Sequence, residues 1–110
     1  MCILSNKPEE FARVMVKKFL SKWEFADVRG QKNDTPIKPD PFAANQIALK
    51  LGVGNSEFLY VGDSNTDMRT AIAAGMFPVG ALWGFRQRDE LLAAGAKSVI
   101  ELPIDLLKLL

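Results

Sequence analysis

Apolar residues gather along the chain in short blocks separated by polar turns, and five of these blocks predict β-strands. The clearest is residues 58–61, because a continuous apolar run bounded by turn residues is typical of a buried strand. The other predicted strands are residues 2–4, 25–29, 78–83 and 98–100.

Between these strands, apolar residues recur at helical spacing, which predicts amphipathic helices. In the first helix Phe11, Met15 and Phe19 lie four residues apart, on one side of an apolar stripe. Glycines at positions 52, 75 and 95 follow three later segments, as expected of helix C-terminal caps. The predicted helices cover residues 8–23, 41–51, 66–74, 87–94 and 103–110, with approximate ends.

Strands that alternate with helices of this length predict an α/β fold, a three-layer Rossmann-like arrangement with a parallel sheet. The whole chain, residues 1–110, is expected to form a single domain, because this length supports one hydrophobic core. In parallel α/β sheets, ligands bind at the carboxyl ends of the strands. The residues directly after each strand are therefore the candidates for function.

Composition narrows the chemistry that is open to the chain. With 14 basic and 13 acidic residues the net charge is +1, so neither nucleic acid nor an anionic membrane is an expected partner. The absence of histidine excludes Ser-His-Asp catalysis and histidine-ligated zinc within the chain. No apolar run could cross a bilayer, no signal-peptide pattern is present, and the single cysteine suits a reducing compartment, so a cytoplasmic location is expected.

Polar side chains follow three of the predicted strands. Ser5 and Asn6 come after the first strand, Lys38 ends the polar loop after the second, and Asp63 and Asp67 follow the third. Carboxylates are the hard oxygen ligands that Mg²⁺ prefers, and a lysine and a hydroxyl beside them suit phosphoryl oxygens. The sequence therefore predicts a site for Mg²⁺ and phosphate at one edge of the sheet.

Each of these residues also has a purely structural interpretation that its own position leaves open. Asp67 is equally well explained as a first-turn partner of the helix dipole, and Asp63 as an Asx-turn residue. Taken alone, Ser5 is better explained as a helix N-cap and Lys38 as a solvated loop charge. The combination at successive strand ends is what favours a functional site.

Three segments resemble, in order, motifs of the haloacid dehalogenase superfamily. Residues 3–7, Ile-Leu-Ser-Asn-Lys, resemble its second motif, an apolar strand that ends in Ser or Thr. Residues 38–41, Lys-Pro-Asp-Pro, resemble the third motif, and residues 62–67 resemble the fourth, which carries paired aspartates. The resemblance covers essentially the whole chain and is greatest to the phosphoglycolate phosphatase branch, through residues 38–75, 82–85 and 90–96.

The resemblance implies a Mg²⁺-dependent phosphatase, a hydrolase of small phosphorylated metabolites, and it implies a role for each candidate residue. Ser5 is expected to hydrogen-bond the phosphoryl group, with the Asn6 backbone nearby. Lys38 is expected to hold the phosphate and the charge of the nucleophile together. Asp63 is expected to coordinate Mg²⁺, and Asp67 to support the metal directly or through water.

The resemblance also implies that part of the family's machinery is missing. The family's first motif, Asp-x-Asp on the central strand, supplies the nucleophile and the general acid/base, and this sequence contains no Asp-x-Asp. The chain is expected to be the C-terminal half of such a core, without cap or central strand, and inactive alone, because covalent phosphoryl transfer needs an in-line nucleophile. Its two open sheet edges are expected to be covered by the missing N-terminal segment, by closing on each other or by self-association.

Two other functions stay open. One is a non-catalytic, truncated relative kept as a binding or assembly module, which the absence of a neighbouring coding segment for Asp-x-Asp-Gly-Thr would favour. The other is a phosphoacceptor receiver domain, which is also α/β but needs acidic residues where this chain has Ser5 and Asn6. The substrate is not predictable from these residues, because the cap selects it. Phosphoglycolate is the expectation from the family.

Overall fold

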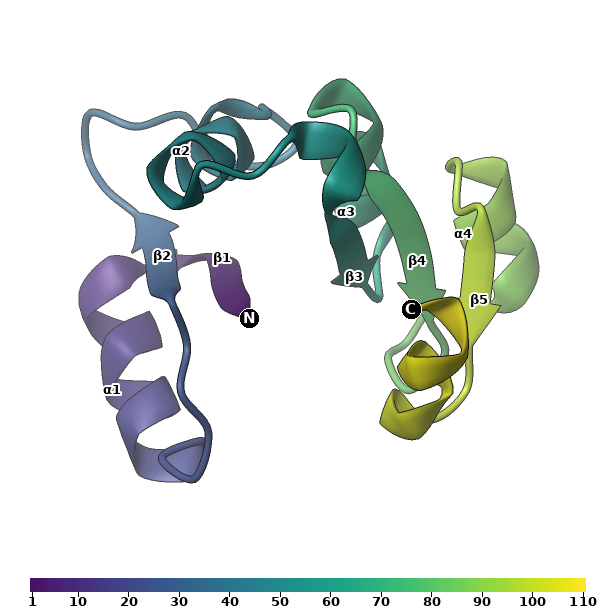
Figure 1. Cartoon of the computed structure of the whole chain (residues 1–110), viewed down its shortest axis with the longest axis horizontal. Coiled ribbons are helices and arrows are strands. Elements are labelled where there is room, and N and C mark those ends of the chain that lie inside the picture. The colour runs from purple at the N-terminus through teal and green to yellow at the C-terminus, as the bar shows by residue number, and fades with distance from the viewer.

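The computed structural model describes residues 1–110 and contains two parallel sheets flanked by helices (Figure 1). β1 (Cys2–Pro8) pairs with β2 (Asp27–Gln31) in the first sheet. β3 (Leu59–Gly62), β4 (Phe77–Ala81) and β5 (Ser98–Ile100) form the second sheet in that order. All three pairings are parallel, which confirms the predicted α/β class. The edges of β1 and β3 are not paired with each other.

Most helices lie where the apolar spacing predicts them, but the first ends at Phe19 rather than at residue 23, and residues 103–109 form a 3₁₀ segment in place of the predicted terminal helix. Gly52 follows α2 with a positive φ of 67°, which confirms its predicted role as a cap. No helix has both the length and the apolarity needed to span a bilayer. The helices are α1 (Glu9–Phe19), α2 (Phe42–Leu51), α3 (Asn65–Ala73) and α4 (Arg88–Ala93), with short 3₁₀ segments η1 (Asn55–Glu57) and η2 (Pro103–Leu109).

The first helix turns its large apolar side chains outward. Phe11 and Phe19 are 63% and 65% exposed, and Met15 is also exposed, whereas Ala12 is buried and Val16 is half-buried. The sequence places both groups on one broad apolar stripe, and the structure separates them. The contacts of α1 with its sheet are therefore made by the smaller residues of that stripe.

α2 joins the two sheets through a core of small side chains. Ala44 and Ala48 of α2 pack with residues that follow or belong to α3, and Leu4 of β1 and Tyr60 of β3 pack against the same cluster. In Figure 1, α2 lies above β1 and β2 in the view and next to α3. A second cluster, formed by Met68, Leu91 and Ala96, holds α3, α4 and β5 together. The relative position of β1 and β3 thus depends on helix packing, not on strand pairing.

A buried carboxylate at the start of β2 strengthens this arrangement. Asp27 is 7% exposed, and its Oδ2 accepts a hydrogen bond from Arg29 Nε at 2.7 Å. Its Oδ1 lies 3.6 Å from Lys50 Nζ, at the end of α2. Burial by itself raises the pKa of Asp27, but the hydrogen bond from Arg29 and the charges of Arg29 and Lys50 outweigh it and hold the pKa below the ordinary value.

We predict that Asp27→Asn lowers the free energy of unfolding by about 1–3 kcal/mol at neutral pH, because it leaves a buried ion pair without its anion. The carboxyl pKa is lower in the folded than in the unfolded chain, so this stabilisation is complete above the unfolded-state pKa of about 3.9. It is lost as the pH falls through the folded-state pKa.

Urea unfolding of the variant and the wild type from about pH 7 to pH 2 measures the difference. Asp34→Asn is the matched control, because Asp34 lies in the exposed loop after β2 and its carboxylate contacts only Thr35. A deficit in Asp27→Asn that stays constant down to the acid end of the range contradicts the assignment.

Candidate phosphate and metal site

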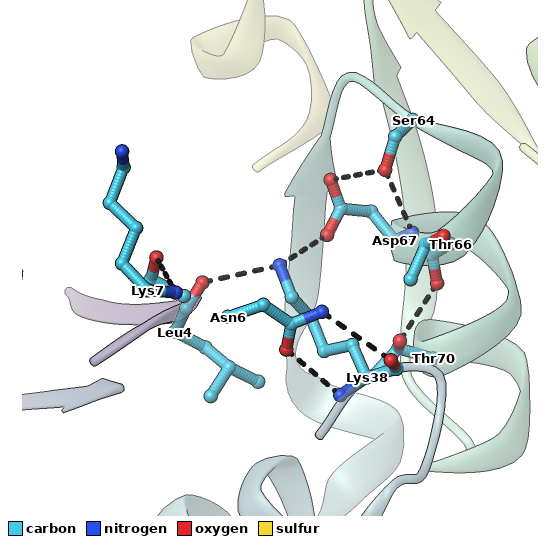
Figure 2. Close-up of polar contacts among 9 residues, drawn as sticks. Leu4, Asn6, Lys7, Lys38, Ser64, Thr66, Asp67 and Thr70 are labelled. Atoms are coloured by element: carbon cyan, nitrogen blue, oxygen red, sulfur yellow. Dashed lines mark hydrogen bonds and ion pairs between the residues drawn. The ribbon is translucent and has the colours of Figure 1, made fainter. Parts of the chain in front are cut away.

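Lys38 connects the two sheets at their carboxyl ends (Figure 2). Its Nζ donates to Asp67 Oδ1 at 2.7 Å and to the backbone oxygen of Leu4 at 3.5 Å. The side chains of Lys38 and Asp67 are 13% and 11% exposed, so solvent screens this ion pair weakly. Because Leu4 belongs to β1 and Asp67 lies in the first turn of α3, which follows β3, this one lysine links a strand of the first sheet to the helix that follows the first strand of the second sheet.

Asp67 is fixed from two sides. Its Oδ2 accepts a hydrogen bond from Ser64 Oγ at 3.0 Å, and its own N–H donates to the same hydroxyl at 3.2 Å. Ser64 is therefore the N-cap of α3, and Asp67 lies in the first turn, where a carboxylate interacts favourably with the helix dipole. Asp67 therefore stabilises the N-terminus of α3 and is also part of the candidate site. The Ser-x-x-Asp spacing is the sequence signal that identifies Ser64.

Asp63 differs from Asp67 in being exposed. It takes no part in the contacts that fix Asp67 (Figure 2). Its carboxylate lies against the loop after β4, where a Cβ atom added to Gly84 would stand 2.5 Å from Asp63 Oδ2. A larger residue at position 84 would displace this carboxylate, so Gly84 is a residue of the site that sequence reasoning did not select.

Asn6 holds the backbone of Lys38 in place. Its Oδ1 accepts from the Lys38 N–H at 3.0 Å, and its Nδ2 donates to the Lys38 carbonyl oxygen at 3.4 Å (Figure 2). Ser5 Oγ accepts from the Lys7 N–H at 3.1 Å, which orients this hydroxyl in the middle of β1. The pairing of Asn6 with Lys38 has no local sequence signal, because the two residues are 32 positions apart.

A cavity of about 550 Å³ lies between the two sheets, and four of the five predicted site residues line it. These four are Ser5, Lys38, Asp63 and Asp67, whereas Asn6 does not contribute to its wall. The remaining lining is mainly apolar. The structure thus brings together Ser5 of β1 with residues that follow β2 and β3. The predicted strand 2–4 continues to Pro8 in the structure, so Ser5 and Asn6 lie within β1 and not after it.

Tyr60 is a second residue that sequence reasoning missed. It belongs to β3, and its hydroxyl is buried without a hydrogen-bond partner. Burial and the nearby negative charge of Asp67 raise the pKa of the Tyr60 hydroxyl, so it stays neutral and protonated at physiological pH. It adds an unused hydrogen-bond donor to the wall of the same cavity.

The donor set fits a magnesium ion that shares its coordination with phosphate. No three His, Cys, Asp or Glu side chains are grouped so that they could hold a metal ion by themselves. Mg²⁺ commonly binds one or two carboxylates and completes its coordination with phosphate oxygens and water. Asp63 is the freer of the two carboxylates here, because Lys38 and Ser64 already engage both oxygens of Asp67.

The chain belongs to the family of haloacid dehalogenase-like hydrolases, whose model matches residues 1–81. It is 35% identical over 88 residues to a phosphoglycolate phosphatase of Xanthomonas campestris, covering 80% of this chain and 40% of that protein. A phosphoglycolate phosphatase of Xylella fastidiosa is 33% identical over 102 residues, which cover 92% of this chain and 44% of that protein. The chain therefore spans less than half the length of these two relatives.

A solved structure of a haloacid dehalogenase-like protein from Agrobacterium tumefaciens superimposes with a TM-score of 0.87 at 29% identity. The match covers 98% of this chain and 52% of that one. The two sheets of this chain therefore have the arrangement that they have in a larger protein of the same family. Because the chain belongs to this family, its interpretation as a phosphoacceptor receiver domain no longer applies.

We predict that Gly62→Ala destabilises the fold by about 1–3 kcal/mol, because the added methyl group overlaps the Asp67 side chain. Urea unfolding of the variant measures the loss. Gly54→Ala is the control, since its Cβ would have only Glu57 nearby, at an ordinary 3.6 Å. Equal stability of Gly62→Ala and the wild type would show that Asp67 does not lie against this turn.

Proposed function

We propose that this chain provides the phosphate- and Mg²⁺-binding part of a phosphomonoester hydrolase that acts on a small phosphorylated metabolite. Phosphoglycolate is the leading candidate substrate, because several curated relatives are phosphoglycolate phosphatases. The observation that carries the proposal is the convergence of Ser5, Lys38, Asp63 and Asp67 on one cavity at the carboxyl ends of the strands.

Lys38 and Ser5 are the proposed phosphate ligands. A lysine ammonium group has three donors, and Lys38 uses two of them on Asp67 and Leu4. The third is available for a phosphoryl oxygen, and Ser5 lines the same cavity. The Asp67 carboxylate keeps the ammonium group in place before the substrate arrives, which reduces the cost of ordering it.

Asp63 is the proposed first ligand of Mg²⁺, with Asp67 supporting the ion directly or through water. When bound, the ion would neutralise charge that develops on the phosphoryl group. Asp63 suits this role because its carboxylate is exposed and uncommitted beside the lysine site. Gly84 permits the close approach of the loop after β4 and so positions this ligand.

Neither Asp63 nor Asp67 acts as the nucleophile in the proposed reaction. Asp67 is buried and held by Lys38 and Ser64, and Asp63 is assigned to the metal. Hydrolysis through a phosphoryl-enzyme intermediate then needs a carboxylate from outside residues 1–110. The chain alone is expected to bind phosphate in the presence of Mg²⁺ without hydrolysing phosphomonoesters.

Calorimetric titration of the 110-residue chain with inorganic phosphate, with and without Mg²⁺, tests the proposal. We predict Mg²⁺-dependent phosphate binding that Asp63→Asn weakens at least about tenfold, a loss of about 1.4 kcal/mol in binding free energy. Asp34→Asn is the control and leaves binding unchanged, because Asp34 lies in the exposed loop away from the cavity. Hydrolysis of p-nitrophenyl phosphate is expected to stay at background for all three proteins.

The possible results separate the parts of the proposal. Robust hydrolysis that Asp63→Ala abolishes would support a phosphatase and overturn the claim that the chain is inactive alone. A folded chain that binds neither Mg²⁺ nor phosphate contradicts the proposal and favours a non-catalytic binding or assembly module. Phosphate binding that does not respond to Asp63→Asn refutes the assigned metal ligand.

A further inference from the structure

The hydroxyl group of Tyr60 is a polar group of the site that the structure leaves unpaired. It is buried and has no hydrogen-bond partner. A donor in this state has lost its contacts with water without gaining one from the protein, and native structures contain few such groups. Tyr60 lines the cavity of the candidate site, so we looked for its partner among the residues of that site.

Tyr60 lies on the face of β3 that contacts Asp67. Side chains two residues apart in a strand point to the same side, and Gly62 is two residues after Tyr60. A Cβ atom added to Gly62 would meet the side chain of Asp67. On this same side, Tyr60 packs against the cluster of small side chains from α2 and α3. The Tyr60 side chain is therefore directed toward the helix that carries Asp67.

Asp67 can accept a further hydrogen bond. Its Oδ1 accepts from Lys38 and its Oδ2 from Ser64, whereas a carboxylate offers about four acceptor positions. Tyr60 keeps its proton, because burial and the nearby charge of Asp67 raise the pKa of its hydroxyl. A neutral donor without a partner thus lies near an anion with unused acceptor positions.

Binding of phosphate would change the charges around Asp67. In the proposed function Lys38 donates to a phosphoryl oxygen as well as to Asp67, so two anions share one ammonium group. The two anions also repel each other, because both lie close to Lys38. A hydrogen bond from a neutral hydroxyl to the carboxylate offsets part of this cost and adds no charge to the site.

We propose that Tyr60 is a positioning residue of the site, whose hydroxyl donates a hydrogen bond to Asp67 when phosphate and Mg²⁺ are bound. Tyr60, Ser64 and Lys38 then hold the carboxylate together, in the place where it supports the metal. The donor is unpaired in the free chain and paired in the complex, so the hydrogen bond contributes to ligand affinity and not to the stability of the free fold. This inference rests on the proposed function.

The variant Tyr60→Phe removes only the hydroxyl group and tests this role. In urea unfolding the free variant is expected to be at least as stable as the wild type, because the lost group has no partner in the free chain. Calorimetric titration with inorganic phosphate at saturating Mg²⁺ is expected to show about tenfold weaker binding, since a hydrogen bond to a charged group is lost. A hydroxyl with only a structural role would give lower stability and unchanged affinity.

Thr70→Val is the matched control, because it also removes a single buried hydroxyl. Thr70 is fully buried in α3, and its Oγ1 donates to the Thr66 carbonyl oxygen at 2.8 Å (Figure 2). It does not line the cavity. This variant is expected to be less stable than the wild type, because it loses a hydrogen bond that the free chain makes, and to bind phosphate with wild-type affinity.

A spectroscopic measurement on the unmutated side chain gives an independent result. Tyr60 is the only tyrosine of the chain, so tyrosine isotopically labelled at its ζ carbon gives a single NMR signal. The ζ carbon carries the hydroxyl oxygen, and its signal therefore responds to hydrogen bonding of that group. We expect this signal to shift when phosphate is added in the presence of Mg²⁺, and not when chloride is added at the same ionic strength.

Unchanged phosphate affinity of Tyr60→Phe overturns the proposal, and so does a ζ-carbon signal that does not move when phosphate binds. Lower stability of Tyr60→Phe with wild-type affinity assigns the hydroxyl to a structural contact and also overturns it. A wild-type chain that binds no phosphate refutes the proposed function and this inference with it. Phosphate binding that Asp63→Asn weakens and Tyr60→Phe does not leaves the proposed function intact and refutes only the role of Tyr60.

Discussion

The ion pair between Lys38 and Asp67 holds together the ends of two sheets that share no hydrogen-bonded strands. Removing one partner of such a largely buried pair leaves an uncompensated charge, which costs about 3–5 kcal/mol in comparable cases. Ser64 and Asn6 support the two partners, through the carboxylate of Asp67 and the backbone of Lys38. The geometry of the site therefore depends on contacts that, together with the packing of α2, also fix the relative position of the two sheets.

This dependence reconciles the structural and functional interpretations of the site residues. Asp67 is a first-turn helix residue and the anion that orients Lys38, and these roles do not compete. Ser5 accepts a hydrogen bond from a neighbouring N–H in addition to lining the cavity. The Asp63 carboxylate takes part in none of these hydrogen bonds or ion pairs, and it is therefore the side chain most available to a metal ion.

Local sequence patterns predicted the elements of the fold well, because caps and turns act over a few residues. Gly52 ends α2 with a positive φ, as its position after the helix indicated. The order of the strands also predicted which polar residues would line the cavity. Such local patterns could not predict contacts between segments that are far apart in the sequence. The pairing of Asn6 with Lys38, the approach of Gly84 to Asp63 and the outward face of α1 all depend on tertiary packing.

Paramagnetic broadening by Mn²⁺, used as a substitute for Mg²⁺, tests most directly whether the two sheets form one metal and phosphate site. In the presence of inorganic phosphate, the account predicts that amide signals of Ser5 and Asp63 broaden together, although Ser5 belongs to β1 of the first sheet and Asp63 follows β3 of the second. Broadening confined to other acidic positions such as Glu9 or Asp105, with Ser5 and Asp63 unaffected, would contradict the account.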